Sequence, residues 1–409
     1  MLDKIPALLP GLELPVIRGA AMLAAAMAEG RSVAEIAATL GGPFADDAAM
    51  IAASFDTAVL AFLSGRSEVG LALQADLVAQ ARIFRVAPGA AAIRATRPLR
   101  LLGFVAAGDL QTNMPIEFIT AHLPVLLDIV FVTADGGLPL VLPEHDVAIC
   151  LVSDSRPDIL HRLAATLAGW PRPVLNDPAR VLGGHLEKLS RDGISQLFAG
   201  SHTVLAPPSR TYARAVLCDA ALEHDWPILA RPAESHAGRL LSKLDTSAEL
   251  AAYLDSVAAE QITLTRFVDY SDADGQYRKR RIVLIEGEPH LAHMAISANW
   301  MIHYVNAGMV DSAAKRAEEA AAMDGFEDGF ARRHAAAFDE IAAALGLDYV
   351  LIDCAEAPDG RLLLFEVEMA AIIHALDPVA LFAYKQPHMQ CVFEAFGRML
   401  EQAAGVLVE

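Results

Sequence analysis

The stretch GLDYVLIDCAEAPDGRLLLFEVE, residues 346–368, predicts a β-hairpin around which the rest of the chain can be organised. Two apolar runs flank the dipeptide Asp359-Gly360. An Asp-Gly pair between apolar runs is typical of a two-residue type I′ turn, because both central residues of that turn take positive φ. Counting outward from this turn places Asp353 directly opposite Glu366.

Three carboxylates are expected on one face of this hairpin. Strand side chains repeat every two residues, so Glu368 shares the face of Glu366, with Asp353 opposite. Like charges opposite each other destabilise a sheet, so the cluster requires a cation. All-oxygen ligands suit Mg²⁺, which in turn suggests phosphates. The pattern therefore predicts Asp353, Glu366 and Glu368 as metal ligands, and it leaves open a hairpin at a sheet edge with solvated acids.

Composition limits the classes of protein that need to be considered. The 409 residues have room for two or three domains. Apolar residues make up 54% of the chain, but no uninterrupted run reaches the ~18–20 residues of a membrane span. Four cysteines without metal-ligand spacing are consistent with reduced thiols and a cytoplasmic location. A net charge of −19 disfavours a nucleic-acid partner, so any phosphate site must be a local basic pocket.

Residues 1–98 are expected to form an N-terminal all-α helical domain. Alanine is abundant, and apolar residues recur at three- and four-residue spacing, as in 45–64. Ser32 stands three residues before Glu35, which is typical of a capping box at a helix start. The region carries no evident chemistry, so we expect packing, a homodimer contact or a surface for a protein or peptide partner.

Residues 99–175 predict an α/β domain. Apolar strands at 101–105, 127–133 and 147–152 alternate with helices, which favours a parallel sheet. Such sheets bind ligands at the carboxyl ends of their strands, so the loop 106–115 is a candidate substrate wall. The chain has no G-x-G-x-x-G motif, so a dinucleotide site is not indicated.

Two later segments suggest contacts with phosphate. A strand at 226–230 runs into the small-residue segment ARPAESHAG (230–238), followed by a returning strand, and small residues let backbone N–H groups approach phosphate oxygens. The segment YRKRRIVLIEG (277–287) predicts a basic strand. Strand alternation puts Arg278 and Arg280 on one face and Lys279 and Arg281 on the other, with a solvated strand edge as the alternative.

The order of these segments resembles that of the ATP-grasp superfamily. The likeness is greatest to ribosomal-protein glutamate ligases and glutathione synthetases, including ATP-grasp domains fused to tetratricopeptide-like helical regions. It covers roughly residues 99–400. The resemblance implies an N-terminal helical domain at 1–98, a pre-ATP-grasp α/β domain at 99–175 and an α+β ATP-grasp domain at 176–405, with a mobile lid at about 200–262.

The resemblance also implies roles for individual residues. Arg191 and Arg231 stand where the family has phosphate-binding lysines, and both are departures from that pattern. The nucleotide contacts implied are Ser235, His236, Ala237 and Gly238 over the β- and γ-phosphates, and Arg266, Phe267 and Val268 at adenine. The catalytic candidates implied are Arg281, which matches the arginine at the transferred phosphoryl group, with Arg278 and Asn306. Asp353 and Glu366 match the metal ligands, whereas Glu368 replaces the asparagine that is more common there.

Proteins of this kind use ATP and Mg²⁺, here expected as two ions. The implied activity is a carboxylate–amine or carboxylate–thiol ligase that forms an acyl phosphate, releases ADP and phosphate, and makes a C–N bond on an amino acid or peptide. Two alternatives stay open at this point. One is an ATP-grasp phosphotransferase, and the other is a nucleotide-binding regulatory protein in which the arginine replacements have abolished catalysis.

Overall fold

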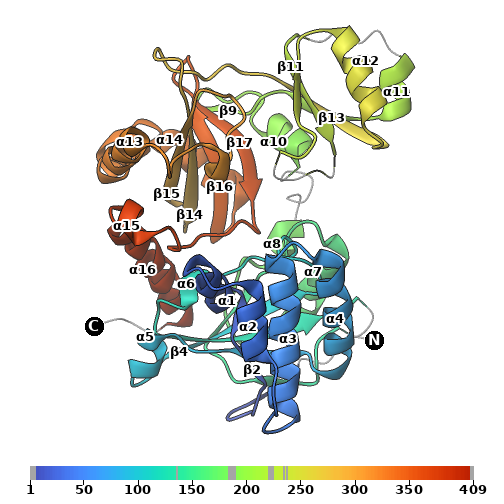
Figure 1. The fold of residues 1–409 in the computed structure, drawn as a ribbon, viewed down its shortest axis with the longest axis vertical. Helices are drawn as coiled ribbons and strands as arrows, with labels where there is room; N and C mark the ends of the chain where they lie inside the picture. Colours follow the sequence, from blue (N-terminus) through green and yellow to red (C-terminus); the bar gives the residue numbers. More distant parts are fainter. Residues whose placement is uncertain are drawn as a thin grey trace.

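The computed structural model describes residues 6–134, 137–182, 190–219, 225–233, 235 and 238–405. The strands within these residues form four sheets of two, four, five and six strands. In Figure 1 the six-stranded sheet and helices α1–α8 occupy the lower half, and the other two large sheets lie above them. None of the described helices is both long and apolar enough to cross a membrane.

The six-stranded sheet is the predicted parallel layer. Its strands in spatial order are β2 (Val16–Ile17), β3 (Ile83–Val86), β5 (Val125–Val132), β4 (Leu99–Ala106), β7 (Val147–Cys150) and β8 (Val174–Leu175). All neighbours are parallel except β3 and β5. A small sheet joins β1 (Ala7–Leu9) to β6 (Val141–Pro143). The helices of this half are α1 (Gly19–Ala28), α2 (Val33–Leu40), α3 (Asp47–Leu63), α4 (Ser67–Gln80), α5 (Ala90–Arg94), α6 (Glu117–Thr120), α7 (Pro157–Leu167) and α8 (Pro178–Leu182).

The prediction of an all-helical region at 1–98 is wrong in one respect. The helices form, and Ser32 and Glu35 make the expected reciprocal capping box at the start of α2. Strands nevertheless begin at residue 7, and β2 and β3 join the six-stranded sheet. Strands of two to four residues are too short to display a period of two against an alanine-rich background, so only long-range pairing reveals them.

Three phenylalanines tie the N-terminal helices to this sheet. Phe55 of α3, Phe84 of β3 and Phe131 of β5 pack with ring centroids 4.7–6.0 Å apart, and Phe84 is completely buried. We expect Phe84→Ala to lower the free energy of unfolding by about 3–5 kcal/mol, because the cavity would adjoin two other rings. Chemical denaturation measures this change. The exposed Phe44 provides the control, since Phe44→Ala should change stability by less than about 0.5 kcal/mol.

The five-stranded sheet contains the predicted hairpin. Its order is β15 (Glu288–Ser297), β14 (Tyr277–Ile285), β16 (Tyr349–Glu356), β17 (Leu362–Glu368) and β9 (Val204–Leu205). The remaining elements around it are η1 (Tyr304–Asn306), α13 (Ala313–Asp324), the π-helix η2 (Glu327–Ala331), α14 (Ala335–Leu345), α15 (Val379–Phe382) and α16 (Lys385–Ala404). Figure 1 shows α13 and α14 on the outer side of this sheet.

The register of the hairpin agrees with the prediction at the carboxylates but not at the turn. Asp353 pairs with Glu366, as expected. The turn, however, has three residues, because the N–H of Ala357 donates to the carbonyl of Arg361, and Gly360 takes a positive φ of 84°. A bulge at Phe365 then shifts the pairing by one residue between Asp353 and Cys354. The longer turn shifts the register by one residue, and the bulge shifts it back by one. Asp353 therefore pairs with Glu366, as predicted.

The four-stranded sheet forms the third part of the fold. Its order is β10 (Ser209–Ala213), β13 (Gln261–Arg266), β11 (Ile228–Pro232) and β12 (Ser242–Leu244), all antiparallel. Helices α11 (Arg214–Asp219) and α12 (Ser247–Ser256) cover it, and α10 (Arg191–Leu197) lies near β10. This sheet has a hydrophobic cluster of its own, drawn from residues 217–264.

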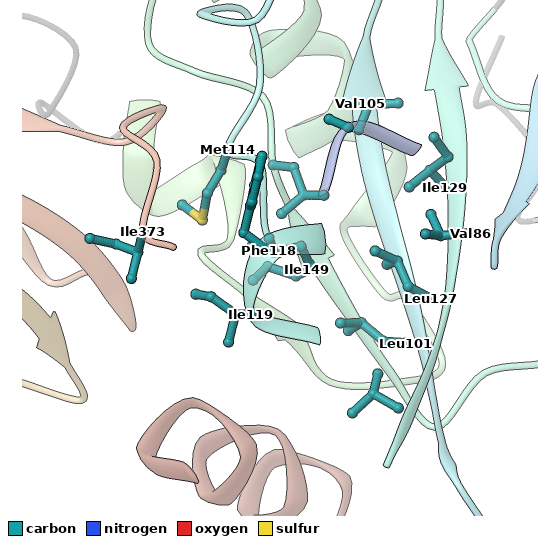
Figure 2. Packing of buried hydrophobic residues seen from close by; sticks show 14 of the residues in the cluster. Val86, Leu101, Val105, Met114, Phe118, Ile119, Leu127, Ile129, Ile149 and Ile373 are labelled. Atoms are coloured by element: carbon teal, nitrogen blue, oxygen red, sulfur yellow. The ribbon is translucent and has the colours of Figure 1, made fainter. Parts of the chain in front are cut away.

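The segment after β17 returns to the first sheet. Ile373 is buried in the same cluster as Met114, Phe118 and Ile119, which follow β4. Figure 2 shows Ile373 beside these residues. The chain therefore runs from Glu368 at the end of β17 into the core of the lower half within five residues.

Candidate active site

A cavity lies between the four-stranded and five-stranded sheets. The four-stranded sheet contributes Leu229 and Arg231 from β11 and Thr265 from β13. The five-stranded sheet contributes Lys279 from β14 and three consecutive residues of β17, Leu364 to Glu366. Alternation would expose only every second strand residue to one side, so the bulge at Phe365 explains why three in a row line the cavity.

One end of the cavity is apolar and aromatic. Phe267 and Trp300 meet at a ring-centroid distance of 5.7 Å, and the Tyr270 hydroxyl donates to the carbonyl of Trp300 at 2.6 Å. The three residues predicted to contact adenine, Arg266, Phe267 and Val268, form the hinge segment, and all three line this end. The rings of Phe267 and Trp300 are nearly perpendicular, at 79°, and an apolar surface of this kind suits a planar aromatic ring.

The backbone of the hinge leaves one donor for a ligand. The N–H of Arg266 donates to Pro208, and that of Phe267 donates to Pro227. Within the described ranges, the N–H of Val268 has no hydrogen-bond partner. A donor beside an apolar slot is the arrangement that fixes the orientation of a flat heterocycle.

The other end of the cavity is basic, and helix α10 supplies one of its cations. Asp192 accepts a hydrogen bond of 2.7 Å from the N–H of Thr211, which fixes α10 on strand β10. Arg191, the first residue of α10, donates to the carboxylate of Glu366. Arg191, beside the four-stranded sheet, thus contacts Glu366 of the five-stranded sheet.

Arg231 supplies a second cation at the end of β11. Its side chain is buried, its Nε donates to the Ser235 hydroxyl at 3.0 Å, and its Nη2 donates to the carbonyl of Ser235. Its Nη1 lies 3.4 Å from Glu366. Burial, and then the nearby Arg191, lower the pKa of Arg231 to about 10. Arg231 therefore remains charged and holds the start of the predicted phosphate loop.

Asp353 lies between two further cations. Its carboxylate accepts from Lys279 at 2.7 Å and from Arg281 at 2.9 and 3.0 Å. Only 3% of Asp353 is exposed. Burial alone would raise the pKa of Asp353, but Lys279 and Arg281 outweigh burial and hold it well below its usual range. The carboxylate is therefore ionised at neutral pH.

The pKa values of the other two carboxylates, Glu366 and Glu368, shift in opposite directions. Burial opposes ionisation of Glu366, but Arg191 and the other nearby cations hold its pKa below the usual range. Burial and the charge of Glu366 raise the pKa of Glu368 to about 7. The donor set is all oxygen, which suits Mg²⁺. Among the described residues, however, no group of three or more His, Cys, Asp or Glu side chains is arranged to hold a metal ion.

The structure does not bring every predicted residue to the cavity. Arg278 lies on the opposite face of β14 and bonds to Asp272 at 2.6 Å, to Asp274 at 2.7 Å and to Glu318. Three carboxylates thus hold its guanidinium, and Arg278 is not among the residues that line the cavity. Asn306 is exposed, and its side chain accepts from the N–H of His303 at 2.9 Å, so it serves a local turn.

Two predicted residues of the phosphate loop, His236 and Ala237, lie outside the described residues. Gly238 lines the cavity with a positive φ of 66°. A Cβ atom at Gly238 would stand 2.6 Å from Nε2 of His303. The close approach of these two segments therefore requires glycine at this position.

Lys279 lines the cavity although it is not among the predicted site residues. Strand alternation places Lys279 on the face of Arg281, and that signal was present in the sequence. Trp300 and His303 also line the cavity, but they lie on a loop without periodicity. Four cationic side chains, from Arg191, Arg231, Lys279 and Arg281, therefore face three carboxylates. Cations thus gather at this place in a chain whose net charge is −19.

No family model and no curated protein matches the sequence. The chain is similar to the RimK domain ATP-grasp protein from Sphaerobacter thermophilus, with 14% identity, a TM-score of 0.41, and coverage of 76% of this chain and 100% of that one. It is also similar to D-alanyl-alanine synthetase A from Vibrio cholerae, with 11% identity, a TM-score of 0.47, and coverage of 76% and 99%.

A third similar structure is the VanG D-Ala:D-Ser ligase from Enterococcus faecalis, with 14% identity, a TM-score of 0.44, and coverage of 76% of this chain and 100% of that one. At these identities and TM-scores the similarity assigns no activity and no substrate to this chain.

Proposed function

We propose that this protein is an ATP-dependent ligase of the ATP-grasp type that joins a carboxylate to an amine. One observation carries the proposal: a cavity between two sheets has an aromatic end, where the N–H of Val268 has no partner among the described residues, and a basic end lined by Arg191, Arg231 and Lys279. The aromatic end suits an adenine ring, and the cations suit a triphosphate. The substrates proposed are an amino acid or short peptide and an amine.

In this proposal the nucleotide spans the cavity from hinge to carboxylates. Adenine lies between Phe267 and the opposite wall and accepts a hydrogen bond from the N–H of Val268. When ATP binds, Arg191 and Arg231 donate to phosphate oxygens in place of the carboxylate of Glu366. A charge-assisted hydrogen bond to phosphate can replace one to a carboxylate. Ser235 and Gly238 cover the β- and γ-phosphates.

The reaction proceeds in two steps. A carboxylate oxygen of the substrate attacks the γ-phosphorus, ADP leaves, and an acyl phosphate forms. The amine then attacks the acyl carbon, and phosphate leaves. Arg281 stabilises the charge on the transferring phosphoryl group, since fixed cations act where charge develops. The paired sheets exclude water, which would otherwise hydrolyse the acyl phosphate.

The metal belongs to this proposal as well. Asp353, Glu366 and Glu368 would hold Mg²⁺, proposed as two ions, which when bound would neutralise phosphate charge. Residues 200–262 are proposed as the mobile lid, because the four-stranded sheet has its own hydrophobic cluster and shares the cavity with the larger sheet. The divisions at 1–98, 99–175 and 176–405 remain proposed boundaries.

The test is the release of ADP and phosphate with defined substrates. Purified protein with ATP and Mg²⁺ is expected to release both only when a carboxylate and an amine are present together, with the amide detected by mass spectrometry. Omission of either substrate, or addition of a chelator, should stop the reaction. ATP binding that is lost in excess chelator would separately support the need for a metal ion.

A second candidate is a nucleotide-binding protein without turnover. It is favoured by the ion pairing of the carboxylates, because Asp353 and Glu366 each already have two cationic partners. Tight ATP binding without ADP release from any carboxylate and amine pair would support this candidate. Absence of ATP binding would contradict both.

A further inference from the structure

The segment from Trp300 to His303 runs along the cavity from its aromatic end to its basic end. All four of its residues line the cavity. Trp300 contacts Phe267 at the aromatic end. The charges that act on the His303 imidazole belong to the basic end and come from Lys279, Glu366, Asp353 and Arg281. His303 therefore lies where the proposed function places the transferring phosphoryl group, although that function gives it no role.

The chain on either side of His303 is anchored. Ile302 is buried in a hydrophobic cluster that contains Met294 and Ile296 of β15. On the other side, the side chain of Asn306 accepts from the N–H of His303 at 2.9 Å, and the N–H of Asn306 donates to the carbonyl of His303 at 3.0 Å. The strand and the turn together fix the backbone from which the imidazole extends.

The Nε2 atom of His303 faces Gly238, which ends the predicted phosphate loop. It is the atom nearest to a Cβ built on Gly238, at 2.6 Å, and Gly238 lines the same cavity. Among the residues that the structure describes, Nε2 has no hydrogen-bond partner. A free ring nitrogen beside a glycine, at the cationic end of a cavity, is suited to an anionic oxygen that both segments can contact.

The imidazole of His303 is neutral at neutral pH. Burial, and then the charge of Lys279, lower the pKa of His303, and the carboxylates of Glu366 and Asp353 only partly oppose this shift. A neutral imidazole has one N–H that donates and one nitrogen that accepts. With its hydrogen on Nε2, His303 offers the cavity a donor without adding a positive charge to the cations already there. This role needs no uptake of a proton, so the burial and the cations that keep the imidazole neutral favour it.

We propose that His303 is a catalytic residue whose Nε2–H donates a hydrogen bond to an oxygen of the γ-phosphate of ATP. This proposal rests on the ligase function proposed above and adds to it a contact that ATP makes and ADP cannot. In the first step, the bond from the γ-phosphorus to the bridging oxygen breaks with its electron pair on ADP, and the bond to the substrate carboxylate oxygen forms. The Nε2–H stays on the imidazole throughout, so His303 stabilises the transferring group without exchanging a proton.

Nucleotide binding tests this contact without requiring turnover. The probes are ADP and the non-hydrolysable analogue adenosine 5′-(β,γ-imido)triphosphate, each with Mg²⁺, and isothermal titration gives the Kd of each. For His303→Leu we expect the Kd of the triphosphate analogue to rise about 10- to 150-fold, which is the effect of losing one hydrogen bond to a charged group. The Kd of ADP should stay close to that of the wild type, because ADP lacks the γ-phosphate.

Two further variants separate the hydrogen bond from the shape of the side chain. His303→Gln keeps an N–H donor at a similar distance from the backbone, so it should bind the triphosphate analogue more tightly than His303→Leu does. His290→Leu is the matched control, since His290 is on β15, opposite Val283, and outside the cavity. This control should bind both nucleotides as the wild type does.

Three outcomes would overturn the proposal. An equal rise in the Kd of ADP and of the triphosphate analogue in His303→Leu would mean that His303 supports the fold or the rest of the nucleotide site. Unchanged Kd values would mean that it does not contact the nucleotide. Both of these results would leave the proposed ligase function standing. If the wild type binds neither nucleotide, the proposed function fails and this inference fails with it.

Discussion

Asp353→Asn is expected to lower ATP-dependent product formation by at least about a hundredfold. The substitution keeps the shape of the side chain but removes the charge that Lys279 and Arg281 share. It also removes an anionic oxygen from the predicted metal ligands. Release of ADP, measured with saturating ATP, Mg²⁺ and both substrates, gives the rate.

The same variant has a consequence for stability. Loss of one member of a buried ion pair commonly costs about 3–5 kcal/mol, because the partner charges are left uncompensated. Thermal and chemical denaturation of Asp353→Asn, with circular dichroism, would show whether the lost activity reflects unfolding. Asp359→Asn is the control, since Asp359 is exposed in the turn of the same hairpin and pairs with Arg361, two residues along the chain. Full activity in Asp353→Asn would refute the assignment of Asp353.

Arg231→Met is expected to weaken ATP binding. Arg231 has a buried guanidinium that holds both the hydroxyl and the carbonyl of Ser235. Hydrogen bonds to charged groups contribute about 1.5–3 kcal/mol, which corresponds to roughly a 10- to 150-fold increase in Kd. Isothermal titration with ATP and Mg²⁺ measures the change.

Two further variants make this test specific. Arg231→Lys keeps the charge but loses the planar fork, so it should bind ATP with intermediate affinity. Arg210→Met removes an exposed arginine from β10 of the same sheet, outside the cavity, and should leave the affinity unchanged. If Arg231→Met binds ATP as tightly as the wild type, the phosphates do not lie at the end of β11.

The hairpin shows what local sequence signals can predict. The Asp-Gly dipeptide located the turn, and counting from it paired Asp353 with Glu366, which the structure confirms. The turn length and the bulge at Phe365 were not predictable, because both depend on how β17 meets its neighbours. Two errors of one residue cancelled. A correct pairing at the carboxylates was therefore reached from an incorrect turn.

The basic strand shows the opposite case. Alternation correctly separated Lys279 and Arg281 from Arg278, yet Arg278 was chosen over Lys279 for the site. The acidic residues Asp272 and Asp274, which bind Arg278, stand only a few residues before it in the sequence. Nearby carboxylates are therefore a usable sign that an arginine is already paired. No comparable signal marks the strands at 16–17 and 83–86. These strands are short, and their pairing partners lie far along the chain.

The separate hydrophobic cluster of the four-stranded sheet has a consequence for folding as well as for catalysis. Its buried residues, all from 217–264, make a small core that is separate from the two large clusters. Regions of this kind open more easily than the molecule as a whole. The segment after β17, by contrast, is anchored through Ile373 in the large core. A nucleotide bound in the cavity would contact both the four-stranded and the five-stranded sheet. Its binding would therefore raise the local stability of residues 209–266 more than that of β14–β17.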